Sequence, residues 1–230
     1  MKEGRLRLLI TFILKCMVII SVIIGIPLSA HGAKGVFMSG STVFMYFTIQ
    51  SNILIGLICL VGLLFLVRKY KPGNGWYTLK YVGTVAITLT GVVFCFILAP
   101  TLGDHAWNVH NILTHVVVPV GAVIDFFVTG TDSDIKKKSV YLVMIPPLLY
   151  AIYAAIGFVN GWEFSKGKNY PYFFLNWSSP AGVFGFSDEL PFMGCAWWII
   201  AILLFLLGIG YFYLRILDIL KKKQQMGSFT

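Results

Sequence analysis

Residues 41–67 read STVFMYFTIQSNILIGLICLVGLLFLV, a run that contains no charged side chain. A helix needs about 20 predominantly apolar residues to cross the hydrocarbon core of a bilayer, and this run is long enough. Five other stretches share its apolar character: 8–29, 81–101, 108–130, 139–161 and 192–217. The sequence therefore predicts an all-α polytopic membrane protein, in which residues 1–230 form a single domain of six transmembrane helices.

The composition also indicates that a bilayer is the solvent. Hydrophobic residues make up 58% of the chain and charged residues only 12%, far from the balance of a soluble domain. Only helices and closed barrels satisfy backbone polar groups in lipid, and the runs lack the alternation of barrel strands. Stretch 8–29 has no clear cleavage site after it, so we interpret it as a helix rather than a signal peptide. The cysteines all fall inside predicted spans, which favours packing roles over disulfides or a metal site: Cys16, Cys59, Cys95 and Cys195.

The net charge of +9 is unevenly placed along the chain. Most of the basic residues lie before the first span, between the second and third, between the fourth and fifth, or near the end of the sixth and after it: Lys2, Arg5, Arg7, Arg68, Lys69, Lys71, Lys80, Lys136, Lys137, Lys138, Arg215, Lys221, Lys222 and Lys223. The other connecting segments contain only Lys34, Lys166 and Lys168. By the positive-inside rule, this placement predicts an integral plasma membrane protein with both termini in the cytoplasm. The rule also accounts for the positive net charge, so we expect no nucleic acid partner.

The segment 162–191 is the one long connection, and it is rich in aromatic residues: Trp162, Tyr170, Tyr172, Phe173, Phe174, Trp177, Phe184 and Phe186. Two interpretations stay open. The segment is either an interfacial aromatic belt or a lid folded over the outer mouth of the bundle.

Polar residues inside the spans are few, and ionisable ones there are functional candidates because burying them is costly. Thr48 and His115 each lie about seven residues, or roughly 10 Å at 1.5 Å per residue, from the outer ends of spans 41–67 and 108–130. Asn52 and Asn111 are each one helical turn from these two residues. We therefore expect a hydroxyl, an imidazole and two amides to share one level of the bundle.

A hydroxyl beside a neutral imidazole has a chemical use. The imidazole takes the proton while the hydroxyl attacks an acyl carbon, and amide or N–H groups hold the oxyanion. The ordinary alternatives stay open, because membrane threonines often bond their own helix and a membrane histidine often bonds a neighbouring helix.

A possible ion pair and a group of three histidines are the other polar features in or near the spans. Lys15 either extends its ammonium group to the membrane surface or pairs with Asp125 at a similar depth. His105, His110 and His115 are spaced by five residues, which does not make the i,i+4 face of a zinc helix. We therefore expect neither a metal site nor a cofactor.

Three segments together resemble the androgen-induced protein and androgen-dependent TFPI-regulating protein family of six-span membrane hydrolases, which has small bacterial relatives. They are YFTIQSNIL at 46–54, NILTH at 111–115 followed by Pro119 and Asp125, and YPYFFL at 170–175.

This resemblance implies that the protein is a lipid-ester hydrolase of a bacterial cell membrane. It implies Thr48 as the nucleophile and His115 as the base, acting on fatty acid esters of hydroxy fatty acids. Tyr170, Pro171 and Phe174 of the third segment would bind or orient the substrate, beside Asn52 and Asn111. The rival hypotheses are a small transporter or lipid-binding protein, for which Pro146 and Pro147 would mark a mobile helix, and a purely structural role.

Overall fold

A computed structural model describes residues 2–32 and 40–227, and within these ranges it contains helices but no β-strand. Lys34 lies outside the described residues, as does the side chain of His105. The elements in chain order are α1 (Lys2–Gly32), η1 (Gly40–Met45), α2 (Phe47–Val67), α3 (Asn74–Val93), η2 (Phe94–Leu98), α4 (Ala99–Leu102), η3 (Gly103–Ala106), α5 (Val109–Ile112), η4 (Leu113–Val117), α6 (Val118–Gly130), η5 (Lys137–Met144), α7 (Ile145–Val159), η6 (Phe173–Leu175) and α8 (Cys195–Gly227).

Six helical segments of the described chain are long and apolar enough to cross a membrane, which confirms the predicted fold class. They are Gly4–His31, Phe47–Val67, Asn74–Leu102, Val109–Gly130, Lys137–Val159 and Cys195–Met226. The second helix begins at Phe47 and not at Ser41, because residues 40–45 form the separate 3₁₀ helix η1. The last helix extends ten residues beyond the predicted end at 217 and includes Lys221, Lys222 and Lys223.

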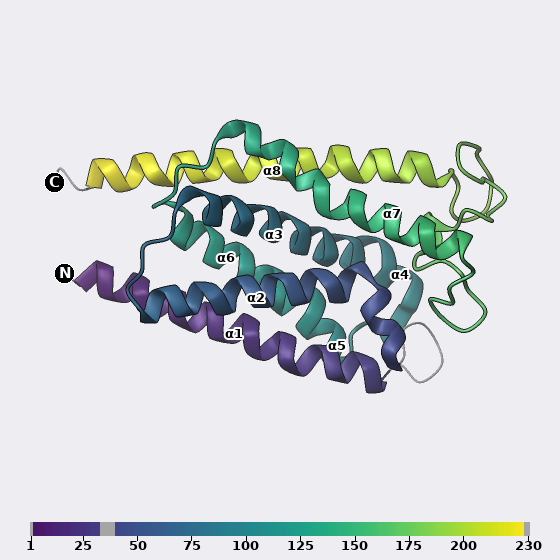
Figure 1. Ribbon diagram of the computed structural model, residues 1–230, viewed down its shortest axis with the longest axis horizontal. Coiled ribbons are helices and arrows are strands. Elements are labelled where there is room, and N and C mark those ends of the chain that lie inside the picture. Colours follow the sequence, from purple (N-terminus) through teal and green to yellow (C-terminus); the bar gives the residue numbers. More distant parts are fainter. Residues whose placement is uncertain (1, 33–39, 228–230) are drawn as a thin grey trace.

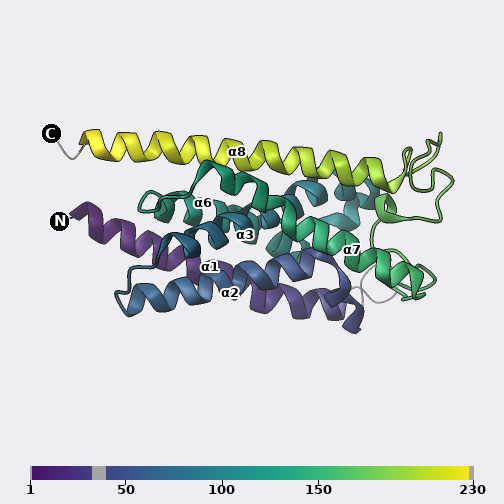
Figure 2. The same cartoon turned by 45° about the horizontal axis from the view of Figure 1, so that its top comes forward.

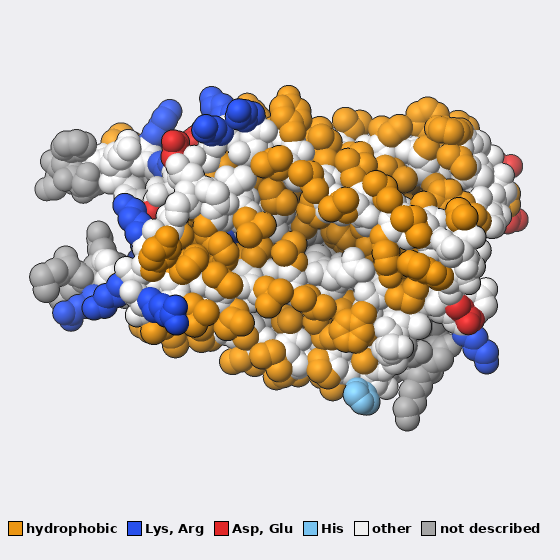
Figure 3. Space-filling view, viewed as in Figure 1, with side chains coloured by type: hydrophobic (Ala, Val, Ile, Leu, Met, Phe, Trp, Pro, Cys, Tyr) orange, Lys and Arg blue, Asp and Glu red, His pale blue; other side chains and the backbone are white. Residues whose placement is uncertain are grey.

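The helices lie nearly along one axis, with both termini at the same end of the molecule (Figure 1). We call this the termini end, and the opposite end, where residues 160–194 lie, the loop end. Helices α1, α2, α3 and α6 pack on one another, while α8 runs along the length of the bundle against α3, α6 and α7 (Figures 1 and 2). Lys and Arg side chains gather mainly at the termini end, and hydrophobic side chains cover the face between the ends (Figure 3).

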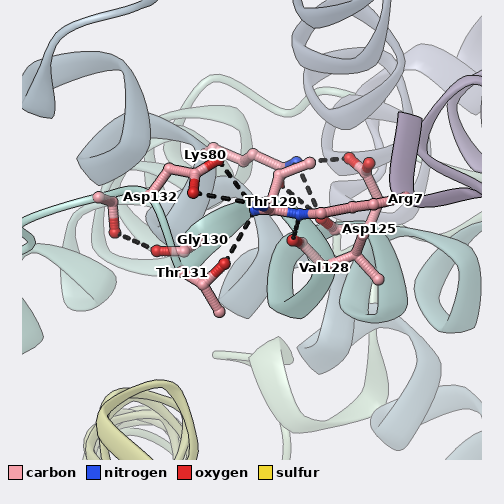
Figure 4. A network of polar contacts seen from close by, with 9 residues as sticks. Arg7, Lys80, Asp125, Val128, Thr129, Gly130, Thr131 and Asp132 are labelled. Carbon is pink, nitrogen blue, oxygen red and sulfur yellow. Dashed lines mark hydrogen bonds and ion pairs between the residues drawn. The ribbon is translucent and has the colours of Figure 1, made fainter. Parts of the chain in front are cut away.

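A buried charge cluster of Lys15, Lys80 and Asp125 joins α1, α3 and α6. The Lys15 Nζ lies 2.6 and 2.7 Å from the two Asp125 carboxylate oxygens, so the predicted alternative of an ion pair is confirmed. Lys80 was expected in the connection between spans, which is wrong, because α3 begins at Asn74 and carries Lys80 into the bundle. Its Nζ lies 2.5 Å from Asp125 Oδ2 and also donates to Thr129 Oγ1 (Figure 4). A lysine is tolerated at this buried position because these acceptors satisfy its ammonium group.

The loop end is held by aromatic and aliphatic packing. Phe164, Tyr172, Phe174 and Leu175 of the long connection are buried in one cluster with residues of η2, α4 and α7. Later in the same connection, Phe184 and Phe186 are exposed. The first part of this segment therefore covers the end of the bundle, and the second part projects from it.

Candidate functional site

Thr48 lies in the first turn of α2, where the chain enters the helix after the extended residue Tyr46. The first N–H groups of a helix have no partner within it. The Thr48 N–H donates instead to the hydroxyl of Tyr172, at 3.3 Å, and the two hydroxyl oxygens lie 3.4 Å apart. The side chain of Thr48 is only 5% exposed, so these are contacts in a desolvated environment.

Asn52 connects the Thr48 turn to the segment that carries His115. Its Nδ2 donates to the carbonyl of Thr48 at 2.8 Å and to the carbonyl of Thr114 at 3.1 Å. Because one amide reaches both carbonyls, Thr48 and Thr114 lie at one level of the bundle. The Oδ1 of Asn52 is buried and accepts no hydrogen bond from the described residues.

His115 lies in η4, a π-helical segment, and is 3% exposed. Its Nδ1 lies 3.1 Å from the carbonyl of Asn111 and 3.0 Å from Thr114 Oγ1. The Thr114 hydroxyl donates its hydrogen to the carbonyl of His110, so both neighbours of Nδ1 act as acceptors. Nδ1 must therefore carry the hydrogen, which leaves Nε2 as the basic nitrogen of the neutral ring.

A second π-helical segment, η2, holds the other side of the imidazole. The Phe94 ring stacks on the His115 ring with centroids 3.8 Å apart. A Cβ added to Gly91 would lie 3.0 Å from the carbonyl oxygen of His115, so α3 approaches η4 where it lacks a side chain. The Phe94 ring on one face and the two contacts of Nδ1 therefore fix the orientation of the imidazole.

The Thr48 side chain lines an apolar cavity of about 60 Å³ near the loop end. Its walls come from α2, α3, α7, α8 and the segment around η6: Phe47, Thr48, Leu89, Thr90, Val93, Leu98, Pro147, Tyr150, Ala151, Tyr172, Phe174, Leu175, Ile199, Ile202 and Leu203. The polar side chains among these described residues are hydroxyls, and none is charged. The lining suits an apolar group with an uncharged polar group near Thr48, and the volume is that of a short segment of a hydrocarbon chain.

The structure brings together only part of the predicted site. Thr48 and Phe174 line the cavity, Asn52 connects to Thr48, and His115 does not line the cavity. Among the described residues no direct hydrogen bond joins Thr48 to His115.

The other predicted residues lie further from the Thr48 hydroxyl. The Asn111 side chain donates to the carbonyl of Ala106, so only its backbone contacts His115. Tyr170 is half-buried and Pro171 is buried, but neither lines the cavity.

Sequence reasoning missed Tyr172, Tyr150 and Thr90 as residues of the cavity. Tyr172 was noted only as one of many aromatic residues in the long connection, although it is the residue that contacts the Thr48 hydroxyl. Its position between Pro171 and Phe174 in the YPYFFL segment was the available signal. The π-helical segments η2 and η4 have no recognisable sequence signal that we could have used.

These features define an all-α polytopic membrane protein with a hydroxyl-lined apolar cavity inside the bundle. Among the side chains that the structure describes, no group of three histidine, cysteine or acidic residues could hold a metal ion. No protein-family model, no curated protein and no solved structure matches the chain.

Proposed function

We propose that this protein is an intramembrane hydrolase of fatty acid esters, with Thr48 as the nucleophile and His115 as the general base. The observation that carries the proposal is that Thr48 presents a buried hydroxyl to an apolar cavity and is connected through Asn52 to the segment that carries His115. The resemblance of the three segments to the androgen-induced protein family supports it. That resemblance favours fatty acid esters of hydroxy fatty acids as substrates and a bacterial plasma membrane, with both termini cytoplasmic, as the location.

In the proposed reaction the Thr48 oxygen forms a bond to the acyl carbon while its proton moves to His115 Nε2. The alcohol then leaves with that proton, and water attacks the acyl carbon while His115 takes a proton from it. The bond from the acyl carbon to the Thr48 oxygen breaks, this oxygen takes the proton back from His115, and the carboxylic acid is released. Hydrogen bonds between catalytic groups are often long before the substrate binds. The missing direct bond between Thr48 and His115 in the free protein is therefore compatible with this role.

The test is ester hydrolysis by protein purified in mild detergent. Thr48→Ala and His115→Ala should each lower kcat by about 100-fold or more, because a positioned base alone contributes about 100-fold to 10,000-fold. Thr78→Ala and His110→Ala are matched controls, since Thr78 is half-buried near the termini end, where its hydroxyl bonds Asn74, and His110 presents only its backbone to Thr114. A fluorophosphonate probe should label Thr48, with the site identified by mass spectrometry.

Full hydrolytic activity in the Thr48→Ala or His115→Ala variant would overturn the proposal. The rival function, a transporter or lipid-binding protein, would be indicated by a co-purified lipid together with no turnover and no labelling of Thr48.

A further inference from the structure

Tyr172 reaches the candidate nucleophile from outside the spans. It lies in the connection between α7 and α8, yet it is only 5% exposed and lines the same cavity as Thr48. Its ring packs edge-on against Tyr46, with centroids 5.6 Å apart, and stacks on Phe174 at 5.1 Å. These ring contacts hold the Tyr172 hydroxyl in place beside Thr48, although the residue belongs to a long connection.

The hydrogen of the Tyr172 hydroxyl can be donated to Thr48 Oγ1 or to a ligand beside it. The oxygen accepts the Thr48 N–H at 3.3 Å. The nearby Tyr150 hydroxyl donates its own hydrogen to the carbonyl of Met45. Burial raises the pKa of Tyr172, so the phenol keeps its hydrogen at neutral pH.

The cavity needs such a donor if an ester is attacked there. When Thr48 attacks, the carbonyl oxygen becomes negative, and uncompensated charge in an apolar cavity is costly. Among the described residues that line the cavity none is Lys, Arg or His. Hydroxyl and backbone N–H groups are therefore the donors at hand, and Tyr172 is the one that contacts Thr48 Oγ1.

We infer that Tyr172 is a further catalytic residue, which donates a hydrogen bond to the oxyanion that forms when Thr48 attacks the ester carbonyl. In this step the Oγ–C bond forms, the π electrons of the carbonyl move to its oxygen, and the Thr48 proton passes to His115. Tyr172 keeps its proton throughout. As the carbonyl oxygen enters, the Thr48 N–H becomes free to serve as a second donor. This inference rests on the proposed hydrolase function.

Steady-state hydrolysis by Tyr172→Phe tests the inference, because this variant removes one oxygen atom and keeps the ring packing. Loss of one oxyanion donor typically lowers kcat by about 100-fold to 1,000-fold. We expect a decrease of about 100-fold in kcat, with KM changed by less than about threefold since the donor acts on the transition state. The matched control is Tyr46→Phe, which removes a hydroxyl that bonds the same connection at the carbonyl of Phe164 and does not line the cavity.

A tetrahedral mimic gives a second readout. A long-chain trifluoromethyl ketone adds the Thr48 oxygen and forms a hemiketal oxyanion, which ¹⁹F NMR detects. It should bind Tyr172→Phe about 100-fold more weakly than the wild type, and Tyr46→Phe within about threefold of the wild type.

The outcomes separate the inference from the proposed function. If Thr48→Ala abolishes turnover while Tyr172→Phe keeps kcat and mimic affinity within threefold, the role of Tyr172 is wrong and the hydrolase stands. A rise in KM alone would assign Tyr172 to substrate binding and would also overturn the inference. A wild-type protein that neither hydrolyses esters nor forms the hemiketal would overturn both.

Discussion

Replacing Asp125 by Asn should be the most damaging single change in the charge cluster of Lys15, Lys80 and Asp125. Asp125 is fully buried and is the shared carboxylate of two lysines that are 4% and 3% exposed. The Asp125→Asn variant would leave two ammonium groups side by side without a counter-charge. Breaking a buried ion pair by removing one partner costs about 3–5 kcal/mol.

The matched control is Lys15→Met. This change removes one ammonium group and leaves the electrically neutral pair of Lys80 and Asp125, so its cost should be about 1–2 kcal/mol. For a chain of this length 1 kcal/mol corresponds to about 2–4 °C in Tm. We therefore expect Tm to fall by about 6–20 °C in Asp125→Asn and by about 2–8 °C in Lys15→Met.

Thermal unfolding in detergent can be followed with a thiol-reactive fluorophore, because Cys59 and Cys195 are free and buried in the folded protein. The order of the two variants is the decisive result. If Asp125→Asn unfolds within 2 °C of the wild type, or at a higher temperature than Lys15→Met, the cluster does not hold the three helices by charge compensation.

Three smaller perturbations follow from the same structure. Asn52→Leu keeps the side-chain size but removes the amide that bonds two carbonyls, so ester hydrolysis should fall at least about tenfold. The change also removes the buried Oδ1, which has no hydrogen-bond partner among the described residues, so Tm should fall by no more than about 4 °C. Gly91→Ala places a Cβ 3.0 Å from the His115 carbonyl and should cost about 1–3 kcal/mol by thermal unfolding, whereas Gly208→Ala, with open space around it, should not lower Tm. Arg7→Gln breaks a half-exposed ion pair and should change stability by less than about 1 kcal/mol in the same assay, and a larger loss would show that this pair is not solvent-screened.

The sequence was sufficient to predict the six spans because each apolar run exceeds the length that a bilayer requires. It also placed Lys15 and Asp125 at matching depths, and the ion pair between them was one of the two expected outcomes. Lys80 was misassigned because it directly precedes the predicted span 81–101, where a lysine has the pattern of a surface residue. Only the three-dimensional position of Asp125 explains why Lys80 is buried.

The candidate site was harder to predict, because its geometry depends on backbone irregularities and on a long connection. Residue counting put Thr48 and His115 at one level, and the shared amide of Asn52 agrees with that level. Counting along a regular helix did not predict that His115 lies in a π-helical segment stacked on Phe94. The contact of Tyr172 with Thr48 depends on how the connection folds back, which no periodicity encodes.

The wall of the cavity formed by α7 and α8 has a consequence for how any ligand is supplied. The membrane-spanning stretches that contain these helices are the least buried of the six. In their most apolar part, only 22% and 17% of the residues are buried. Lipid therefore surrounds the side of the molecule on which this wall stands. The relevant concentration of a ligand is then its mole fraction in the bilayer, so diluting it with inert lipid should weaken occupancy even when its total amount per volume is unchanged.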